Sequence, residues 1–187
     1  RVFIVEVMGH KVGWLTLHAG IASGADIILI PEIPYKIDSV VEAINRRTKQ
    51  GKRFSILAVA EGAISYEDSL LSKKDLKEKR KKNPYPSISY EIGHEIEEKT
   101  GQEIRITVPG HMQRGGDPCP YDRVLSSRLG AAAAGLILKG DYGKMVGIKN
   151  GEIVGVPLSE VAGKLKMVSP DSSIVKEAKL LGISFGD

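Results

Sequence analysis

Three short apolar runs begin the chain: VFIVEV at residues 2–7, DIILI at residues 26–30 and SILAVA at residues 55–60. Each consists mostly of aliphatic residues and stops at Met-Gly, proline or glutamate, which is typical of a short buried strand. The segments between them, residues 13–24 and 37–50, carry apolar side chains at helical spacing. Strand, helix, strand, helix, strand in this order predicts an α/β domain with a mostly parallel sheet.

The rest of the chain first departs from this alternation and then resumes it. Ser65–Pro86 is polar, charged and contains prolines, so it is expected to be an insertion or a mobile excursion. The later elements are expected to be a helix at Ile88–Thr100, a strand at Glu103–Val108, a helix at Asp122–Leu138, a hairpin of Met145–Ile148 with Glu152–Val156, and a helix at Ile174–Leu181. Asn150-Gly151 is the strongest short turn signal for such a hairpin.

The charge of the chain is concentrated in one segment. The formal net charge is +4, and Lys73–Lys82, with seven basic and two acidic residues, alone carries +5, so the rest of the chain is close to neutral. A nucleic-acid-binding protein would instead present a basic face with interleaved aromatic residues on its folded body. We therefore expect no nucleic-acid partner and interpret the run as a solvated helix or loop, although a nucleic-acid-binding domain is kept as a minor alternative.

Composition also limits the compartment and the cofactors. The 187 residues suffice for one domain, or for one and part of a second. Cys119 is the only cysteine, so no internal disulfide forms and a reducing, cytoplasmic location is expected. No apolar stretch is long enough to span a bilayer, and no signal-peptide pattern is present, so no membrane partner is expected. The four histidines show no metal-ligand spacing, which argues against a zinc site.

Polar residues gather where the predicted strands end. Met8-Gly-His-Lys11 follows the first strand, Glu61 follows the third, and His111–Gly116 follows the strand that contains Arg105. Open α/β sheets bind ligands at these ends, and arginine, carboxylate and glycine together suit a phosphorylated sugar. Structural alternatives stay open: Arg105 paired with a neighbouring glutamate, His111 as a hydrogen-bonded structural residue, Glu61 as an exposed strand end, and Gly115-Gly116 as a turn.

Three longer strings carry a resemblance to a known family. They are VEVMG at residues 5–9, ASGADIILIPE at residues 22–32 and GHMQRGGDPCPYDR at residues 110–123. Together they resemble the sugar-phosphate-binding, carboxy-terminal half of phosphofructokinases, whose signature is G-H-x-Q-R-G-G-x-P-x-P-Y-D-R. The resemblance implies a three-layer, Rossmann-like α/β domain, plus segments that pack on an amino-terminal domain.

The resemblance implies a division of the chain and roles for particular residues. Residues 1–112 would form the fructose 6-phosphate domain, with the insertion at about 65–86. Residues 113–163 would pack with a donor-binding domain, and residues 164–187 would return to the first domain. The expected substrate-binding residues are Met8, Gly9, His10, Glu61, His111 and Arg114. Arg1 and Arg105 are expected to reach an adjacent subunit's substrate in a homo-oligomer, a dimer or tetramer. A bacterial-type effector site would use Gly24, Asp26, Lys52 and Arg53.

Two departures from the family pattern matter. The family's M-G-R turn reads M-G-H here, so His10 replaces a permanently charged, bidentate arginine, and Lys11 matches its charge but not its geometry. The family's donor-binding glycine loop and catalytic aspartate would precede Arg1, so we expect no catalytic residue in this chain and no activity from it alone. Mg²⁺ is expected only with the phosphoryl donor in the full-length enzyme.

The resulting functional hypothesis is part of a 6-phosphofructokinase, a glycolytic kinase. The enzyme would transfer a phosphoryl group from ATP to the 1-hydroxyl of D-fructose 6-phosphate. Pyrophosphate is the alternative donor, because related enzymes that use it also carry long insertions like Ser65–Pro86. A non-catalytic, sugar-phosphate-sensing regulatory module is the alternative from a different class, and His10 is the residue that favours it.

Overall fold

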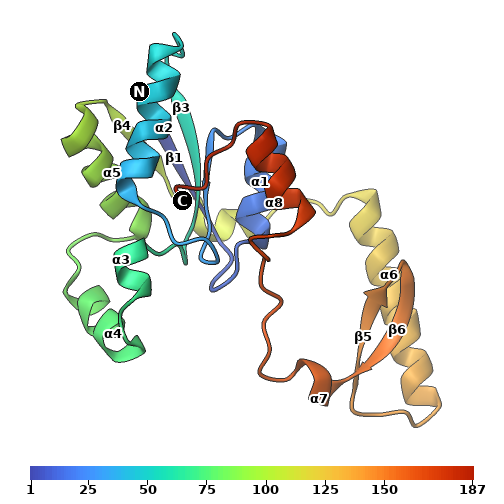
Figure 1. The fold of residues 1–187 in the computed structure, drawn as a ribbon. Helices are drawn as coiled ribbons and strands as arrows, with labels where there is room; N and C mark the ends of the chain where they lie inside the picture. The colour runs from blue at the N-terminus through green and yellow to red at the C-terminus, as the bar shows by residue number, and fades with distance from the viewer. The chain divides into compact units, whose positions relative to one another are not determined.

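A computed structural model describes residues 1–187, which divide into two units. The first unit comprises residues 1–113 and 167–187, and the second comprises residues 114–166 (Figure 1). The strands and helices of the first unit are β1 (Val2–Val7), α1 (Trp14–Ser23), β2 (Ile27–Leu29), α2 (Ile37–Lys49), β3 (Ser55–Ala60), α3 (Tyr66–Ser69), α4 (Lys73–Lys82), α5 (Ile88–Thr100), β4 (Ile104–Thr107) and α8 (Ser173–Leu180). Those of the second are α6 (Pro120–Leu138), β5 (Lys144–Lys149), β6 (Glu152–Pro157) and α7 (Leu158–Val161). The 3-10 helix η1 (Gly110–Arg114) includes the last residues of the first unit's first stretch and Arg114, the first residue of the second unit.

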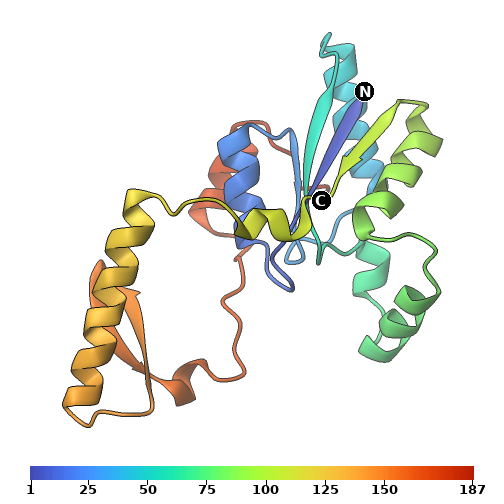
Figure 2. The same cartoon turned by 180° about the vertical axis from the view of Figure 1, so that it is seen from behind.

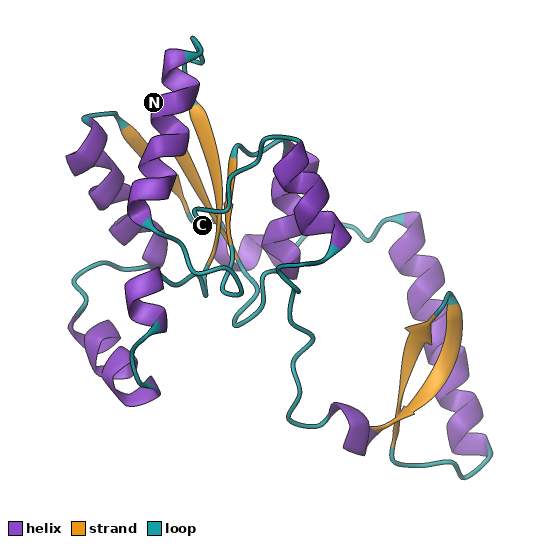
Figure 3. Ribbon diagram, viewed as in Figure 1, coloured by secondary structure: helices purple, strands orange, loops and turns teal.

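The first unit is a three-layer α/β domain, as the sequence predicts. Its four strands are all parallel, in the order β2-β3-β1-β4. Helices α2 and α5 cover one face of the sheet, and α1 and α8 cover the other (Figures 1 and 3). Since both faces are covered, β1, β2 and β3 are almost uninterrupted apolar runs, whereas β4, at the edge of the sheet, alternates between half-buried isoleucine and exposed polar residues.

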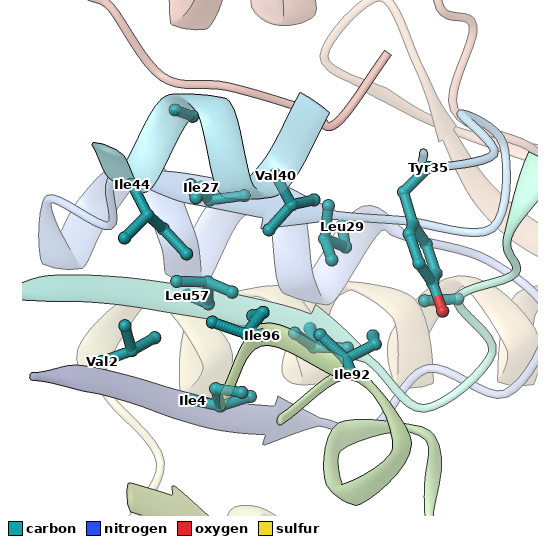
Figure 4. Packing of buried hydrophobic residues seen from close by; sticks show 13 residues of the cluster. Val2, Ile4, Ile27, Leu29, Tyr35, Val40, Ile44, Leu57, Ile92 and Ile96 are labelled. Atoms are coloured by element: carbon teal, nitrogen blue, oxygen red, sulfur yellow. The ribbon is translucent and has the colours of Figure 1, made fainter. Parts of the chain in front are cut away.

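Two apolar cores hold these layers together. On the α2 and α5 face, Ile4, Leu57, Ile44 and Ile96 are fully buried in one cluster (Figure 4). On the opposite face, Leu17 of α1 and Val175 of α8 are buried against the sheet. The carboxy-terminal segment also joins the sheet through a bridge between Ile27 and Ser184. The last residues of the chain are therefore part of this domain's core.

The basic segment is more regular than a loop. The sequence leaves Ser65–Pro86 as an insertion or mobile excursion, whereas the structure places α3 and α4 there. Ser65 and Ser72 each accept a hydrogen bond from a backbone N–H three residues later, at 3.1 Å and 3.2 Å, which is how serine caps a helix. No residue of α4 is buried, so the helix is a solvated one, in agreement with the first of the two interpretations of Lys73–Lys82.

The second unit consists of a long helix and a hairpin. The hairpin is confirmed: β5 and β6 pair antiparallel, and Lys149 faces Glu152 across the turn. Asn150 and Gly151 both have positive φ, 52° and 83°, as a type I′ turn requires. The short helix α7, which follows β6 directly, was not predicted. None of the helices in either unit is both long and apolar enough to span a membrane.

Candidate functional site

The carboxyl ends of β1 and β3 bring two predicted site segments together. These strands are parallel neighbours with Val7 in register with Ala60, so the residues after both strands meet at one edge. The backbone N–H of Glu61 donates to the Val7 carbonyl at 3.0 Å. The Oε1 atom of Glu61 accepts hydrogen bonds from the N–H of Gly9 at 3.1 Å and of His10 at 2.6 Å. Glu61 therefore holds the loop after β1 in place.

This loop is tightly folded, and two glycines permit it. His10 has a φ of 55°, a left-handed conformation that residues other than glycine seldom adopt. A Cβ on Gly9 would lie 2.6 Å from the carbonyl oxygen of Val12, and one on Gly62 would lie 2.1 Å from that of His10. Both obstacles are backbone atoms, so a side chain at either position would displace the loop.

The helix η1 contributes two side chains near the same edge. Gln113 accepts a hydrogen bond from the N–H of Met8 through Oε1 at 3.1 Å and donates through Nε2 to the carbonyl of Glu6 at 3.4 Å. His111 lines a pocket of about 130 Å³ together with Met8 and Glu61. Gln113 was not among the residues predicted from the sequence, although its place in the G-H-x-Q-R-G-G string was a signal for it.

Three pockets share Glu61 and together form the candidate site. The largest, about 440 Å³, is also lined by His10, Lys11 and Arg80. The second, about 240 Å³, has Arg80 in its wall as well, together with the segment that follows α4. The third is the His111 pocket. A carboxylate beside a lysine and an arginine suits a ligand that carries both hydroxyl groups and an anionic group.

Arg80 is a site residue that sequence reasoning missed. It belongs to α4, within the basic run Lys73–Lys82 that we interpreted as a solvated segment. The pattern of the run gave no sign that one of its seven cations turns toward a pocket. Only the path of the chain after β3 brings Arg80 to the side of Glu61.

The other predicted substrate residues divide between the two units. Met8, Gly9, His10, Glu61 and His111 all lie in the first unit, around the pockets just described. Arg114 belongs to the second unit, and its role toward the substrate stays a prediction.

The two arginines expected to serve an adjacent subunit lie together, away from this site. Arg1 precedes β1 and Arg105 is in register with Phe3, so both are near the amino ends of the strands, at the end of the sheet where Figure 2 marks the amino terminus. Glu61 instead follows the carboxyl end of β3. Arg1 Nε contacts Glu103 Oε2 at 2.7 Å, and Arg105 Nη2 contacts Glu103 Oε1 at 2.6 Å. The hydrogen bond from Arg105 is the main cause that lowers the pKa of Glu103, and the charges of Arg1 and Arg105 add to it. Arg105 thus pairs with a neighbouring glutamate, as one of the alternatives foresaw, and its role toward an adjacent subunit stays a prediction.

The residues predicted for an effector site are mainly engaged in the structure of the fold. Asp26 accepts a hydrogen bond from the N–H of Ile56 at 2.8 Å and pairs with Arg47 at 2.8 Å. Gly24 has a φ of 69° and ends α1 in the left-handed conformation. Lys52 and Arg53 are exposed. Because both oxygens of Asp26 hold the protein itself, the effector site has no support here beyond the sequence.

Metal ligands are not assembled in this chain. No three His, Cys, Asp or Glu side chains lie close enough together to hold an ion. Mg²⁺ prefers a cluster of oxygen ligands, which these residues do not form, and we derive no step through a metal.

Comparison with known proteins agrees with these strings and this fold. A family model described as phosphofructokinase matches residues 1–137. The ATP-dependent 6-phosphofructokinase of Spirochaeta thermophila is 56% identical over the whole chain, which covers 51% of that protein. The chain thus spans about half the length of the curated relatives it matches.

Solved structures show the same relationship. Pichia pastoris phosphofructokinase in the T-state aligns with a TM-score of 0.69 at 37% identity, over 86% of this chain and 16% of that one. A pyrophosphate-dependent phosphofructokinase from Marinobacter aquaeolei aligns with a TM-score of 0.72 over 99% of this chain and 45% of that one. At 20% identity, this second match shows the fold alone. The chain belongs to the phosphofructokinase family.

Proposed function

We propose that this chain supplies the sugar-phosphate acceptor site of an ATP-dependent 6-phosphofructokinase. The observation that supports the proposal best is Glu61, whose carboxylate fixes the loop of Met8, Gly9 and His10 and lines all three pockets of the site. The names of the similar curated proteins supply the reaction and the donor. The substrate would be D-fructose 6-phosphate and the product fructose 1,6-bisphosphate.

The residues of the site would bind and orient the acceptor. Glu61 would accept hydrogen bonds from sugar hydroxyl groups, and Lys11 would attract the anionic part of the ligand from the wall of the 440 Å³ pocket. In the transfer itself, the 1-hydroxyl oxygen forms a bond to the terminal phosphorus of the donor. The bond from that phosphorus to the bridging oxygen breaks, and the hydroxyl proton leaves to a base. We assign neither this base nor the Mg²⁺ that accompanies the donor to the present residues.

The assembly is part of the proposal. Arg1 and Arg105 lie near the amino ends of the strands, whereas the pockets that contain Glu61 lie at the carboxyl ends. The two arginines therefore do not line the pockets of their own chain. In a homo-oligomer their guanidinium groups would be available to a phosphate bound by a neighbouring subunit, once exchanged from Glu103. The oligomer, dimer or tetramer, is therefore expected to share its active sites.

The test is steady-state kinetics of the full-length protein with fructose 6-phosphate, using ATP or pyrophosphate as donor. We expect turnover with ATP, and we expect Glu61→Gln to lower kcat/KM for the sugar phosphate by roughly 10²-fold, because it weakens hydrogen bonds to hydroxyl groups and to the loop. Glu67→Gln, an exposed glutamate on α3, is the matched control and should change kcat/KM less than twofold.

Each other outcome has a definite meaning. Turnover with pyrophosphate but not with ATP would show that pyrophosphate is the donor, and the proposed acceptor site would stand. Binding of fructose 6-phosphate without turnover of either donor would favour the sensing module. Equal effects of the two glutamine substitutions would overturn the assignment of the acceptor site to the Glu61 pockets.

A further inference from the structure

The cations of α4 are not equivalent. Lys79 pairs with Asp68 on the preceding helix, and Lys81 pairs with Glu78 of its own helix at 2.8 Å. Arg80, between them, takes part in none of the ion pairs of the first unit and lines both larger pockets that contain Glu61. A guanidinium group that borders a pocket and forms no ion pair is available to an anionic ligand.

Contacts of the residues that precede Arg80 in the sequence fix the position of α4. Ser72 caps the start of α4 by accepting from the N–H of Asp75 at 3.2 Å. The pair between Lys79 and Asp68 ties the last turn of α4 to α3, and its hydrogen bond raises the pKa of Lys79.

The segment after α4 is anchored as well. Asn83 donates to the carboxylate of Glu91 at 2.6 Å. Ser87 donates through its hydroxyl to Glu6 Oε2 at 2.5 Å, and the N–H of Ser89 donates to the same oxygen at 3.2 Å. Glu6 lies on β1, two residues before Met8, and its exposed fraction is only 7%. Arg80 is thus carried by a segment that is fixed at both ends, next to the loop that forms the site.

We propose that Arg80 binds phosphate oxygens in the acceptor site and so supplies the bidentate cation that His10 does not. This inference rests on the proposed function. His10 and Arg80 line the same pocket of about 440 Å³, so a phosphate group in that pocket is within the region served by both side chains. Arginine presents a planar fork of donors to phosphate, which a neutral, shorter imidazole lacks.

A purely structural role for Arg80 predicts a different result. Basic residues in the last turn stabilise a helix by their interaction with its carboxyl-terminal dipole, and α4 ends with Lys79, Arg80, Lys81 and Lys82. In that case Arg80 and Lys82 would be interchangeable, and their removal would change stability slightly without changing the affinity for substrate.

The experiment is steady-state kinetics of the full-length protein carrying Arg80→Ala, Arg80→Lys or Lys82→Ala, with fructose 6-phosphate and the donor varied separately. We expect Arg80→Ala to raise one KM or lower kcat by about tenfold or more, as loss of a charge-assisted hydrogen bond predicts. Arg80→Lys should recover part of this loss, and Lys82→Ala should stay within twofold of the parent protein. A raised KM for the sugar phosphate would show that Arg80 binds the phosphate group of the acceptor. A raised KM for the donor would show that Arg80 binds the phosphoryl group that is transferred.

The inference is overturned if Arg80→Ala and Lys82→Ala behave alike in kcat and in both KM values. That outcome is distinguishable from failure of the proposed function, which would show as no turnover of fructose 6-phosphate by the parent protein, or as equal effects of Glu61→Gln and Glu67→Gln. Because Arg80 is exposed, its substitution leaves the two apolar cores intact, and circular dichroism of the variants checks this.

Discussion

The two units of the chain bury their side chains very differently. The α/β unit contains every fully buried apolar residue, on both faces of its sheet, whereas no residue of the second unit, residues 114–166, is buried. The second unit instead exposes large apolar side chains: Tyr121, Val124, Ile137, Leu138, Tyr142, Met145, Ile148, Leu158 and Leu165. Exposed apolar area of this extent is typical of a surface that another segment or domain covers.

The comparison shows that regular secondary structure and a hydrophobic core are separate properties. The helix α6 and the β5–β6 hairpin satisfy their backbone hydrogen bonds by local pairing, so they form without a buried interior. The parallel strands of the first unit must instead be joined across long stretches of sequence, which only a substantial apolar core stabilises. We predict that residues 113–163 acquire their core from a domain outside this chain.

The largest expected difference is the cost of removing one leucine from each unit. Leu57→Ala, at a fully buried position of β3, should lower the free energy of unfolding by about 2–5 kcal/mol, because it leaves a cavity between sheet and helices. Leu138→Ala, at a position 88% exposed, should change it by about 0.5 kcal/mol or less. Urea denaturation followed by the fluorescence of Trp14, the only tryptophan, measures the first effect, and far-ultraviolet circular dichroism measures both.

Leu57→Ala and Leu138→Ala can also be compared in the full-length protein. If another domain covers α6 there, the cost of Leu138→Ala should rise to about 2 kcal/mol or more, as for a buried leucine. A cost that stays near zero in the full-length protein would contradict the prediction that the second unit is covered.

A medium effect is expected from adding one methyl group to a glycine in each unit. In Gly62→Ala the new Cβ would meet the carbonyl oxygen of His10 at 2.1 Å, which should cost about 1–3 kcal/mol and displace the site loop. In Gly130→Ala, inside α6, nothing lies within 4 Å of the new Cβ, and the change should stabilise the helix by about 0.5–1 kcal/mol. Thermal unfolding of the two variants gives opposite shifts; shifts of the same sign would show that the close approach at Gly62 relaxes without cost.

The smallest effect concerns the ion pairs near the amino ends of the strands. The pKa of Glu103 is held below its ordinary value. The stabilisation from its ion pairs with Arg105 and Arg1 is therefore complete at a pH above the ordinary pKa of glutamate, and it is lost as the pH falls through the lowered pKa. Arg105→Gln should return the pKa toward its ordinary range more than Arg1→Gln does, because the hydrogen bond from Arg105 is the largest cause.

A carboxyl-carbon NMR titration of Glu103 measures this difference directly. Asp75, which is on α4 and has no arginine partner, serves as the reference carboxylate in the same spectra. Equal shifts in the two arginine variants would contradict the assignment of Arg105 as the main partner.

Much of the fold was predictable because its signals are local. Aliphatic runs, helical spacing, glycine after α1 and α5, and Asn150-Gly151 placed the strands, helices and hairpin within a few residues of their observed bounds. The helices α3 and α4 were not predicted as a pair, since their polar side chains contribute no core periodicity. For the candidate site, Met8, Gly9, His10, Glu61 and His111 were predicted from the sequence, mostly through the family resemblance, and the structure brings them to one edge of the sheet.

By itself, the sequence determined the fold class and the membership in the phosphofructokinase family, because both depend on residue types in a linear order. Only the tertiary structure showed that Glu61 bonds the backbone of the loop after β1, that Asp26 is held by Arg47, and that Arg80 reaches the Glu61 pockets. These relations join residues from different elements, and the register of parallel strands and the path of the connecting segments decide them. A pattern along one chain specifies which side chains are available, whereas packing decides which of them meet.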